Sequence, residues 1–161
     1  MTSRASLPDE EIIVLGDSNL RDFHHPNCAV LSHSNGRLSH FKGLLNSVTS
    51  PLPTAKKFVI CLSTLDIANS FSTNSTTLRS LLGAAHRVFP NATLFVLLLG
   101  TDDDFSASTK SNIQALNNYV VGKHPSSCLH IPPYPDFRCA RDEWDSTTKT
   151  ATFKKISEFL N

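Results

Sequence analysis

The chain has 161 residues, of which 40% are hydrophobic and 18% are charged, and its formal net charge is +1 at pH 7. This length and composition suit one globular domain with a sizeable core. Because the net charge is close to zero and the lysines and arginines are scattered, no global field recruits polyanions, and we expect no strong nucleic-acid binding by this domain alone.

The N-terminal stretch lacks the apolar run of a signal peptide, so we expect a disordered lead-in at 1–10 and a single domain at 11–161. No segment reaches the roughly 18 consecutive apolar residues of a transmembrane helix. The four cysteines have neither the spacing of zinc ligands nor the density of a disulfide framework. These features predict a reduced, cytoplasmic protein with no metal and no cofactor.

Short apolar runs alternate with helical patterns from residue 11 onward. Glu11–Leu15 (EIIVL) has no polar alternation, which is typical of a parallel strand covered on both faces. Asn27–Leu31 (NCAVL) predicts a weaker strand, and Leu38–Val48 predicts a helix with one apolar face. Lys57–Leu62 (KFVICL) predicts a second continuous buried strand.

The second half of the chain continues this alternation. The polar cluster Ser70–Asn74 predicts the N-cap of a helix that ends before Pro90. The remaining expected elements are a strand at Ala92–Leu99, a helix at Ala107–Val121, a strand at Cys128–Ile131, an extended loop at Pro132–Arg141 and a final helix, capped by Ser146–Thr148, that ends at Leu160. About five strands and about five helices alternate, which predicts a three-layer α/β/α sandwich with a parallel sheet.

Polar residues follow several of the expected strands. In parallel α/β sheets the residues that do chemistry gather where the strands end. Here those ends are Gly16–Asn19, Ser63–Asp66, Gly100–Asp104 and the loop Pro132–Asp145. Ser18 directly follows the first buried strand, a position that suits a nucleophile, although a Gly-Asp-Ser-Asn turn also suits a helix cap.

Four stretches of the sequence resemble the SGNH (GDSL-type) hydrolases: "VLGDSNLRDF", "SNGRLSHFKGLL", "KFVICLSTLD" and "RDEWDSTTKTATFKKISEFLN". They cover the chain from about Glu11 to its end, in the family's order. Within this superfamily the chain is most similar to the esterase-like domain encoded by the first open reading frame of some vertebrate LINE retrotransposons. The resemblance implies five parallel strands in the flavodoxin-like order 2-1-3-4-5.

The resemblance also implies a role for each candidate site residue. Ser18 matches the nucleophile, whose backbone N–H also belongs to the oxyanion hole. Gly36 matches the oxyanion glycine, and Asp142 matches the aspartate that orients the catalytic histidine. Two positions depart from the family, because Leu65 stands where the oxyanion asparagine is expected and Asp145 stands where the histidine base is expected.

Both departures weaken ester hydrolysis. A serine hydroxyl needs a base of near-neutral pKa, and the reference pKa of aspartate lies about 2.6 units below that of histidine, a handicap of about 3.5 kcal/mol. Loss of one oxyanion donor costs roughly another 3–4 kcal/mol. The sequence therefore predicts a degenerate esterase-like domain, inactive or very weak, that acts as a binding or interaction module, with a retroelement origin as one hypothesis.

Two other functions stay open. The first is an active esterase on small acyl esters or lipids, with Ser18 as nucleophile and a replacement base. That base would be Asp145, made more basic by the neighbouring Asp142, or one of the histidines His24, His25, His33, His40 and His130. The second is a nucleic-acid-associated accessory domain, which the resemblance to retrotransposon proteins allows.

Three further features have simpler interpretations. We interpret Asp102–Asp104 as a solvated N-terminal helix cap rather than a metal site. Trp144 is expected to form a lid over the former active-site cleft rather than a stacking platform for nucleic acid. Leu65 is expected to make that cleft more apolar, which suits either a binding pocket or a collapsed one.

Overall fold

The computed structural model describes residues 7–161, and five parallel strands form its central sheet. The strands are β1 Ile12–Asp17, β2 Cys28–His33, β3 Lys57–Cys61, β4 Thr93–Leu97 and β5 Leu129–Ile131. Their order is β2-β1-β3-β4-β5, which confirms the predicted topology. Because all four neighbouring pairs are parallel, the carboxyl ends of the strands meet at one edge of the sheet.

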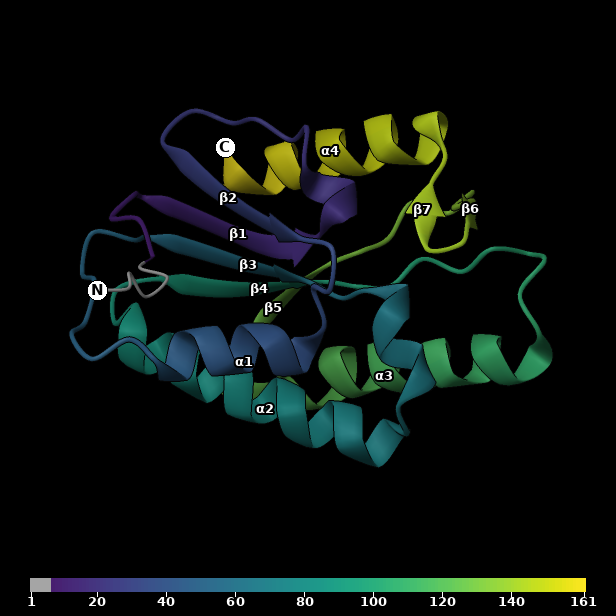
Figure 1. The fold of residues 1–161 in the computed structure, drawn as a ribbon, viewed down its shortest axis with the longest axis horizontal. Helices are drawn as coiled ribbons and strands as arrows, with labels where there is room; N and C mark the ends of the chain where they lie inside the picture. Colours follow the sequence, from purple (N-terminus) through teal and green to yellow (C-terminus); the bar gives the residue numbers. More distant parts are fainter. Residues whose placement is uncertain (1–6) are drawn as a thin grey trace.

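Helices cover both faces of the sheet, as Figure 1 shows. The helices α1 Leu38–Asn46, α2 Phe71–Val88 and α3 Ala107–Lys123 lie on one face, and α4 Ser146–Leu160 lies on the other. Residues 7–161 thus contain four α-helices where about five were predicted, since Ser18 opens only the short 3-10 turn η1 Ser18–Leu20. Among residues 7–161, no helix combines the length and the apolar character that crossing a membrane requires.

The side chains of β1 alternate between two apolar clusters. Ile13 and Leu15 pack with the three-helix side, whereas Ile12 and Val14 pack with α4. This two-sided burial explains why the strand contains no polar alternation. Of the expected lead-in, residues 1–6 lie outside the described part of the chain, and Leu7 is buried in the three-helix cluster.

A small antiparallel hairpin, formed by β6 Cys139–Ala140 and β7 Glu143–Trp144, follows β5. The prediction of an extended loop over Pro132–Arg141 was therefore wrong at its end, because two-residue strands are too short to produce a recognisable hydrophobic period. Arg141 and Asp142 form the two-residue turn, and both have positive φ, 53° and 65°. In Figure 1 the hairpin lies near the start of α4, at the carboxyl edge of the sheet.

The predicted N-cap cluster of α2 is confirmed, whereas the predicted cap of α4 was wrong. Ser70 alone caps α2, and the rest of the predicted cap cluster lies inside the helix, which begins at Phe71. Asp145, rather than Ser146–Thr148, caps α4, and its carboxylate accepts a hydrogen bond from the backbone N–H of Thr148 at 2.8 Å. The reason is positional, since Asp145 has the extended backbone of an N-cap, whereas Ser146 is already helical.

The interpretation of Asp102–Asp104 as a solvated helix cap was wrong for Asp102 and for the cap, although the side chains of Asp103 and Asp104 are 90% exposed. Ser106 caps α3. Asp102 is only 4% exposed; it forms an ion pair with Arg138 at 2.8 Å and accepts a hydrogen bond from Cys139 N–H at 3.0 Å. Its carboxylate therefore anchors the segment that leads into β6.

Candidate functional site

The end of β1 places Ser18 at the carboxyl edge of the sheet, where it is half-buried. The carboxylate of Asp17 fixes the turn that carries it. One oxygen accepts from Asn19 N–H at 2.9 Å, and the other accepts from the Ser63 hydroxyl at 2.8 Å. Since Ser63 follows β3, these bonds tie the ends of two neighbouring strands together beside Ser18.

Gly36 packs directly against the end of β1. A Cβ at this position would lie 2.8 Å from Asp17 Cα and 2.9 Å from the Gly16 carbonyl oxygen, so only glycine fits without a shift of the backbone. The expected oxyanion glycine is thus close to the residue that precedes Ser18. Its N–H, however, donates to the carbonyl oxygen of His33 at 2.9 Å, so this donor is already engaged.

Leu65 lies half-buried in the 3-10 turn η2 Thr64–Ala68, directly after the end of β3. Its side chain has no hydrogen-bond donor, and its backbone N–H donates to the Ser63 hydroxyl at 3.1 Å. Neither group of Leu65 is therefore free to replace the amide of the expected asparagine.

Asp66, the next residue, was not singled out from the sequence as a titrating group. It is 1% exposed; one carboxylate oxygen accepts from Leu38 N–H at 3.0 Å, and the other has no hydrogen-bond partner among the described residues. Burial raises the pKa of Asp66 to about 6, against the opposing effect of the Leu38 N–H. The signal for a buried carboxyl in the sequence was an acidic residue close after a continuous apolar strand.

Asp142 reaches the same edge of the sheet through two hydrogen bonds. Its carboxylate accepts from the Thr64 hydroxyl at 2.6 Å, and its carbonyl oxygen accepts from the Asn19 side-chain amide at 2.9 Å. The Asn19 amide oxygen in turn accepts from Trp144 N–H at 2.9 Å. The structure therefore brings Asp142 near Ser18, but the carboxylate orients a threonine hydroxyl and not a histidine.

Asp145 is engaged at the start of α4. Its carboxylate is exposed to solvent and caps α4 through Thr148 N–H, as described above. Among residues 7–161, no hydrogen bond joins the Ser18 hydroxyl to Asp145.

The five histidines considered as replacement bases are also not bonded to Ser18 among the described residues. The rings of His33 and His40 stack on each other with centroids 4.1 Å apart, and His33 Nδ1 accepts from Asn35 N–H at 3.0 Å. His25 stacks on Phe23. The two others, His24 and His130, have no side-chain hydrogen bond within residues 7–161. The structure thus connects Asp142 to Asn19, the neighbour of Ser18, and among the described residues no hydrogen bond joins the Ser18 hydroxyl to a histidine.

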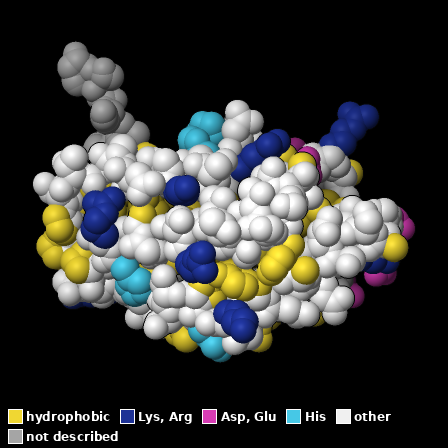
Figure 2. Space-filling view, turned by 90° about the horizontal axis from the view of Figure 1, so that it is seen from below, with side chains coloured by type: hydrophobic (Ala, Val, Ile, Leu, Met, Phe, Trp, Pro, Cys, Tyr) yellow, Lys and Arg dark blue, Asp and Glu magenta, His cyan; other side chains and the backbone are white. Residues whose placement is uncertain are grey.

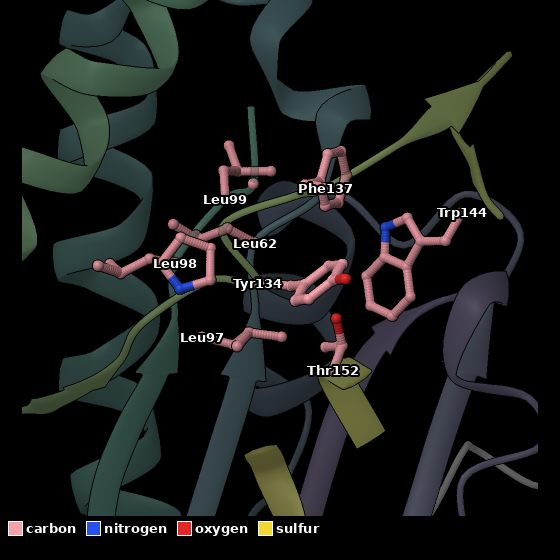
Figure 3. A pocket seen from close by; sticks show the side chains of 10 residues that line it. Leu62, Leu97, Leu98, Leu99, Tyr134, Phe137, Trp144 and Thr152 are labelled. Carbon is pink, nitrogen blue, oxygen red and sulfur yellow. The ribbon is translucent and has the colours of Figure 1, made fainter. Parts of the chain in front are cut away.

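Trp144 packs inward at the same edge (Figure 3). Its ring meets Phe137 edge to face with centroids 6.3 Å apart, and Tyr134 and Thr152 lie beside it over the leucines that end β4. The pocket between these side chains leaves only about 10 Å³, which is about the space of one water molecule. Aromatic side chains therefore fill this part of the carboxyl edge.

An open cleft of about 340 Å³ lies on the other side of the hairpin turn. It is lined by Thr64, Ile67, Ala68, Phe105, Thr109 and Asp142. Leu65 is not among the lining residues. The volume lies within the range of small-molecule sites, and its walls combine apolar side chains with two hydroxyls and one carboxylate.

No protein-family model matches the chain, and no curated protein matches it. Solved structures do share its fold. A GDSL-like lipase from Bacteroides thetaiotaomicron has a TM-score of 0.73 at 12% identity, over 94% of this chain and 88% of that one. A member of the lipolytic G-D-S-L family from Veillonella parvula has a TM-score of 0.62 at 15% identity, over 91% and 96%. The OSK domain of Drosophila Oskar has a TM-score of 0.68 at 13% identity, over 92% and 87%.

Proposed function

We propose that this chain, which has the fold of the SGNH (GDSL-type) hydrolases, is a degenerate serine-esterase-like domain that serves as a binding module. The role of Asp145 carries the proposal. It occupies the position of the histidine base, and its carboxylate caps α4 through Thr148 N–H. A side chain that stabilises a helix start has a structural reason to be retained without catalysis.

The oxyanion side of the site supports the same proposal. Stabilisation of a tetrahedral intermediate requires N–H donors aimed at the developing oxyanion. The N–H of Gly36 donates to the His33 carbonyl oxygen, and Leu65 has no side-chain donor. Ser18 thus lacks both a bonded base and two of its three oxyanion partners, and we therefore expect little or no hydrolysis.

The open cleft beside Asp142 is the ligand site of this proposal. Ile67 and Phe105 supply apolar walls, and Thr109 and the bonded pair of Thr64 and Asp142 supply polar groups. This chemistry fits a small acyl ester or the acyl end of a lipid, bound but not cleaved. A retroelement origin of the domain is part of the same proposal and rests on the four sequence stretches that resemble LINE-encoded domains.

The first test is hydrolysis of p-nitrophenyl acetate by the purified protein and by Ser18→Ala. Because no base is bonded to Ser18, we expect the two proteins to show the same low rate. If the rate disappears with Ser18, the chain is an active esterase with a base that the geometry does not reveal. Replacement of each histidine in turn would then identify that base.

A second experiment restores the missing groups. In Leu65→Asn with Asp145→His, the family's donor and base return, and we expect hydrolysis of p-nitrophenyl acetate to rise at least tenfold above the unchanged protein. The same pair of substitutions combined with Ser18→Ala is the control and should stay at background. Since Asp145→His removes a helix cap worth about 1 kcal/mol, the melting temperature of each variant is measured beside its activity.

A further inference from the structure

The three helices on one face of the sheet contain no aspartate or glutamate. Their charged residues are Lys42 on α1, Arg79 and Arg87 on α2, and Lys110 and Lys123 on α3. Between residues 23 and 101 the only acidic residue is Asp66, and it is buried. Every solvent-exposed formal charge on these helices is therefore positive at neutral pH.

Figure 2 shows this face directly. Lysine, arginine and histidine side chains are spread across it, whereas aspartate and glutamate appear only toward the right-hand side of the view. Many of the acidic residues instead follow β4 and β5 at the carboxyl edge, in Asp102–Asp104, Asp136 and Asp142–Asp145. The net charge of +1 thus conceals an uneven distribution, in which the helices α1, α2 and α3 carry basic but no acidic residues.

Four of the five basic side chains are available for a ligand. Arg87 donates to the carbonyl oxygens of Val48 and Leu45, which fixes it to the end of α1. Lys42, Arg79, Lys110 and Lys123 form no hydrogen bond or ion pair within residues 7–161. They are spread over α1, α2 and α3, so a partner would contact several helices at once.

The other exposed side chains of this face indicate the partner's chemistry. Thr76 and Ser80 on α2, and Ser111, Asn112 and Asn118 on α3, are exposed hydrogen-bond donors without charge. Hydroxyl and amide donors beside lysine and arginine suit the phosphate oxygens of a nucleic-acid backbone. Docking on a membrane would instead need a row of exposed large apolar side chains for insertion, whereas the described part of these three helices exposes only Phe71 and Val121.

We propose that the face formed by α1, α2 and α3 binds the phosphate backbone of a nucleic acid, weakly and without sequence preference. This proposal does not depend on ligand binding in the cleft or on the chemistry of Ser18, and it concerns the solvent-exposed side chains of α1, α2 and α3. Four phosphate contacts correspond to a slope of about −3 for the logarithm of the affinity against the logarithm of the salt concentration for a single strand. Affinity should therefore fall about 50-fold between 50 and 200 mM salt.

The test is fluorescence anisotropy with a labelled 20-nucleotide single-stranded RNA, repeated with single-stranded DNA and with duplex DNA. The face variant is Arg79→Gln with Lys123→Gln. The matched control is Lys149→Gln with Lys154→Gln, which changes the net charge equally but lies on α4, across the sheet. Circular dichroism and melting temperature confirm that both variants fold.

We expect the face variant to lose about tenfold in affinity at 50 mM salt and about half of the salt slope, while the control keeps the affinity of the unchanged protein within about threefold. Equal losses in both variants would mean that only net charge matters and would overturn the proposal. So would absence of binding by the unchanged protein at 50 mM salt. Binding to vesicles with anionic lipid that the RNA does not compete away would assign the face to a membrane instead.

Discussion

Asp66 is buried between η2 and the start of α1, and only one of its two carboxylate oxygens is hydrogen-bonded among the described residues. Burial raises the pKa of this carboxyl to about 6. The folded protein therefore holds a proton on Asp66 at pH values where the unfolded chain has already released it. Stability from this group is present below about pH 4 and is lost as the pH rises through 6.

Asp66→Asn should remove that pH dependence. Two pKa units correspond to about 3 kcal/mol, so the unchanged protein should lose about 2–3 kcal/mol of unfolding free energy relative to Asp66→Asn between pH 4 and pH 8. Urea denaturation at several pH values measures the difference. Asp136→Asn, at an exposed aspartate, is the control and should keep the profile of the unchanged protein. Parallel profiles for the unchanged protein and Asp66→Asn would rule out this role.

Only part of the candidate site could be predicted from the sequence. The position of Ser18 after a buried strand, and the departures at Leu65 and Asp145, could be recognised from sequence stretches alone. The engagement of Gly36 N–H by His33 could not, because it depends on a turn whose hydrogen bonds have no sequence signature of their own. The capping role of Asp145 was missed because three good capping residues follow it directly.

At the scale of elements, the hairpin of β6 and β7 is held in an uncommon turn. A two-residue hairpin loop with both residues at positive φ normally contains Asn-Gly or Asp-Gly, since other residues meet a steric cost of roughly 1 kcal/mol or more. Here the two residues are Arg141 and Asp142. Asp142 gains hydrogen bonds to Thr64 and Asn19 in this conformation, whereas Arg141 forms none within the described residues.

Arg141→Asn should therefore stabilise the protein. Asparagine tolerates the left-handed region, and Arg141 forms no side-chain hydrogen bond or ion pair within residues 7–161, so we expect the unfolding free energy to rise by about 0.5–1 kcal/mol. The midpoint of urea denaturation measures this change. Arg21→Asn is the matched control, because Arg21 is also exposed but has an ordinary φ of −52°, and it should bring no gain. Equal effects at the two sites would show that the gain does not come from the turn.

At the scale of the whole molecule, the apolar runs sufficed to predict the five strands, most clearly the buried β1, β3 and β4. Their order could not be predicted from these runs; it was implied by the resemblance to the SGNH hydrolases, and the structure confirms it. The charge distribution was hidden by the net charge, although the acid-free stretch from 23 to 101 can be read directly from the sequence once Asp66 is known to be buried. Contacts between residues far apart in the chain could not be predicted, because no pattern in the sequence indicates them.

Asn19 connects the turn after β1 to the hairpin of β6 and β7. It is 3% exposed, and its side-chain amide donates to Asp142 and accepts from Trp144, more than 120 residues away. Asn19→Ala leaves the carbonyl oxygen of Asp142 and the backbone N–H of Trp144 without this partner. Each unsatisfied polar group costs about 1–3 kcal/mol when it is buried. Because these two groups are partly buried, we expect the unfolding free energy to fall by about 2–3 kcal/mol.

The single tryptophan of the chain lies in this hairpin, so its fluorescence reports the contact directly. In Asn19→Ala the emission of Trp144 should shift toward longer wavelength, and its amide should exchange with solvent faster than in the unchanged protein. The control is Asn118→Ala, at an exposed asparagine of α3, which should change stability by less than about 0.5 kcal/mol. If Asn19→Ala loses stability while exchange at Trp144 stays unchanged, Asn19 supports only its own turn. The hairpin would then be held by its other contacts, which include the hydrogen bond from Thr64 to Asp142 and the packing of Trp144 against Phe137.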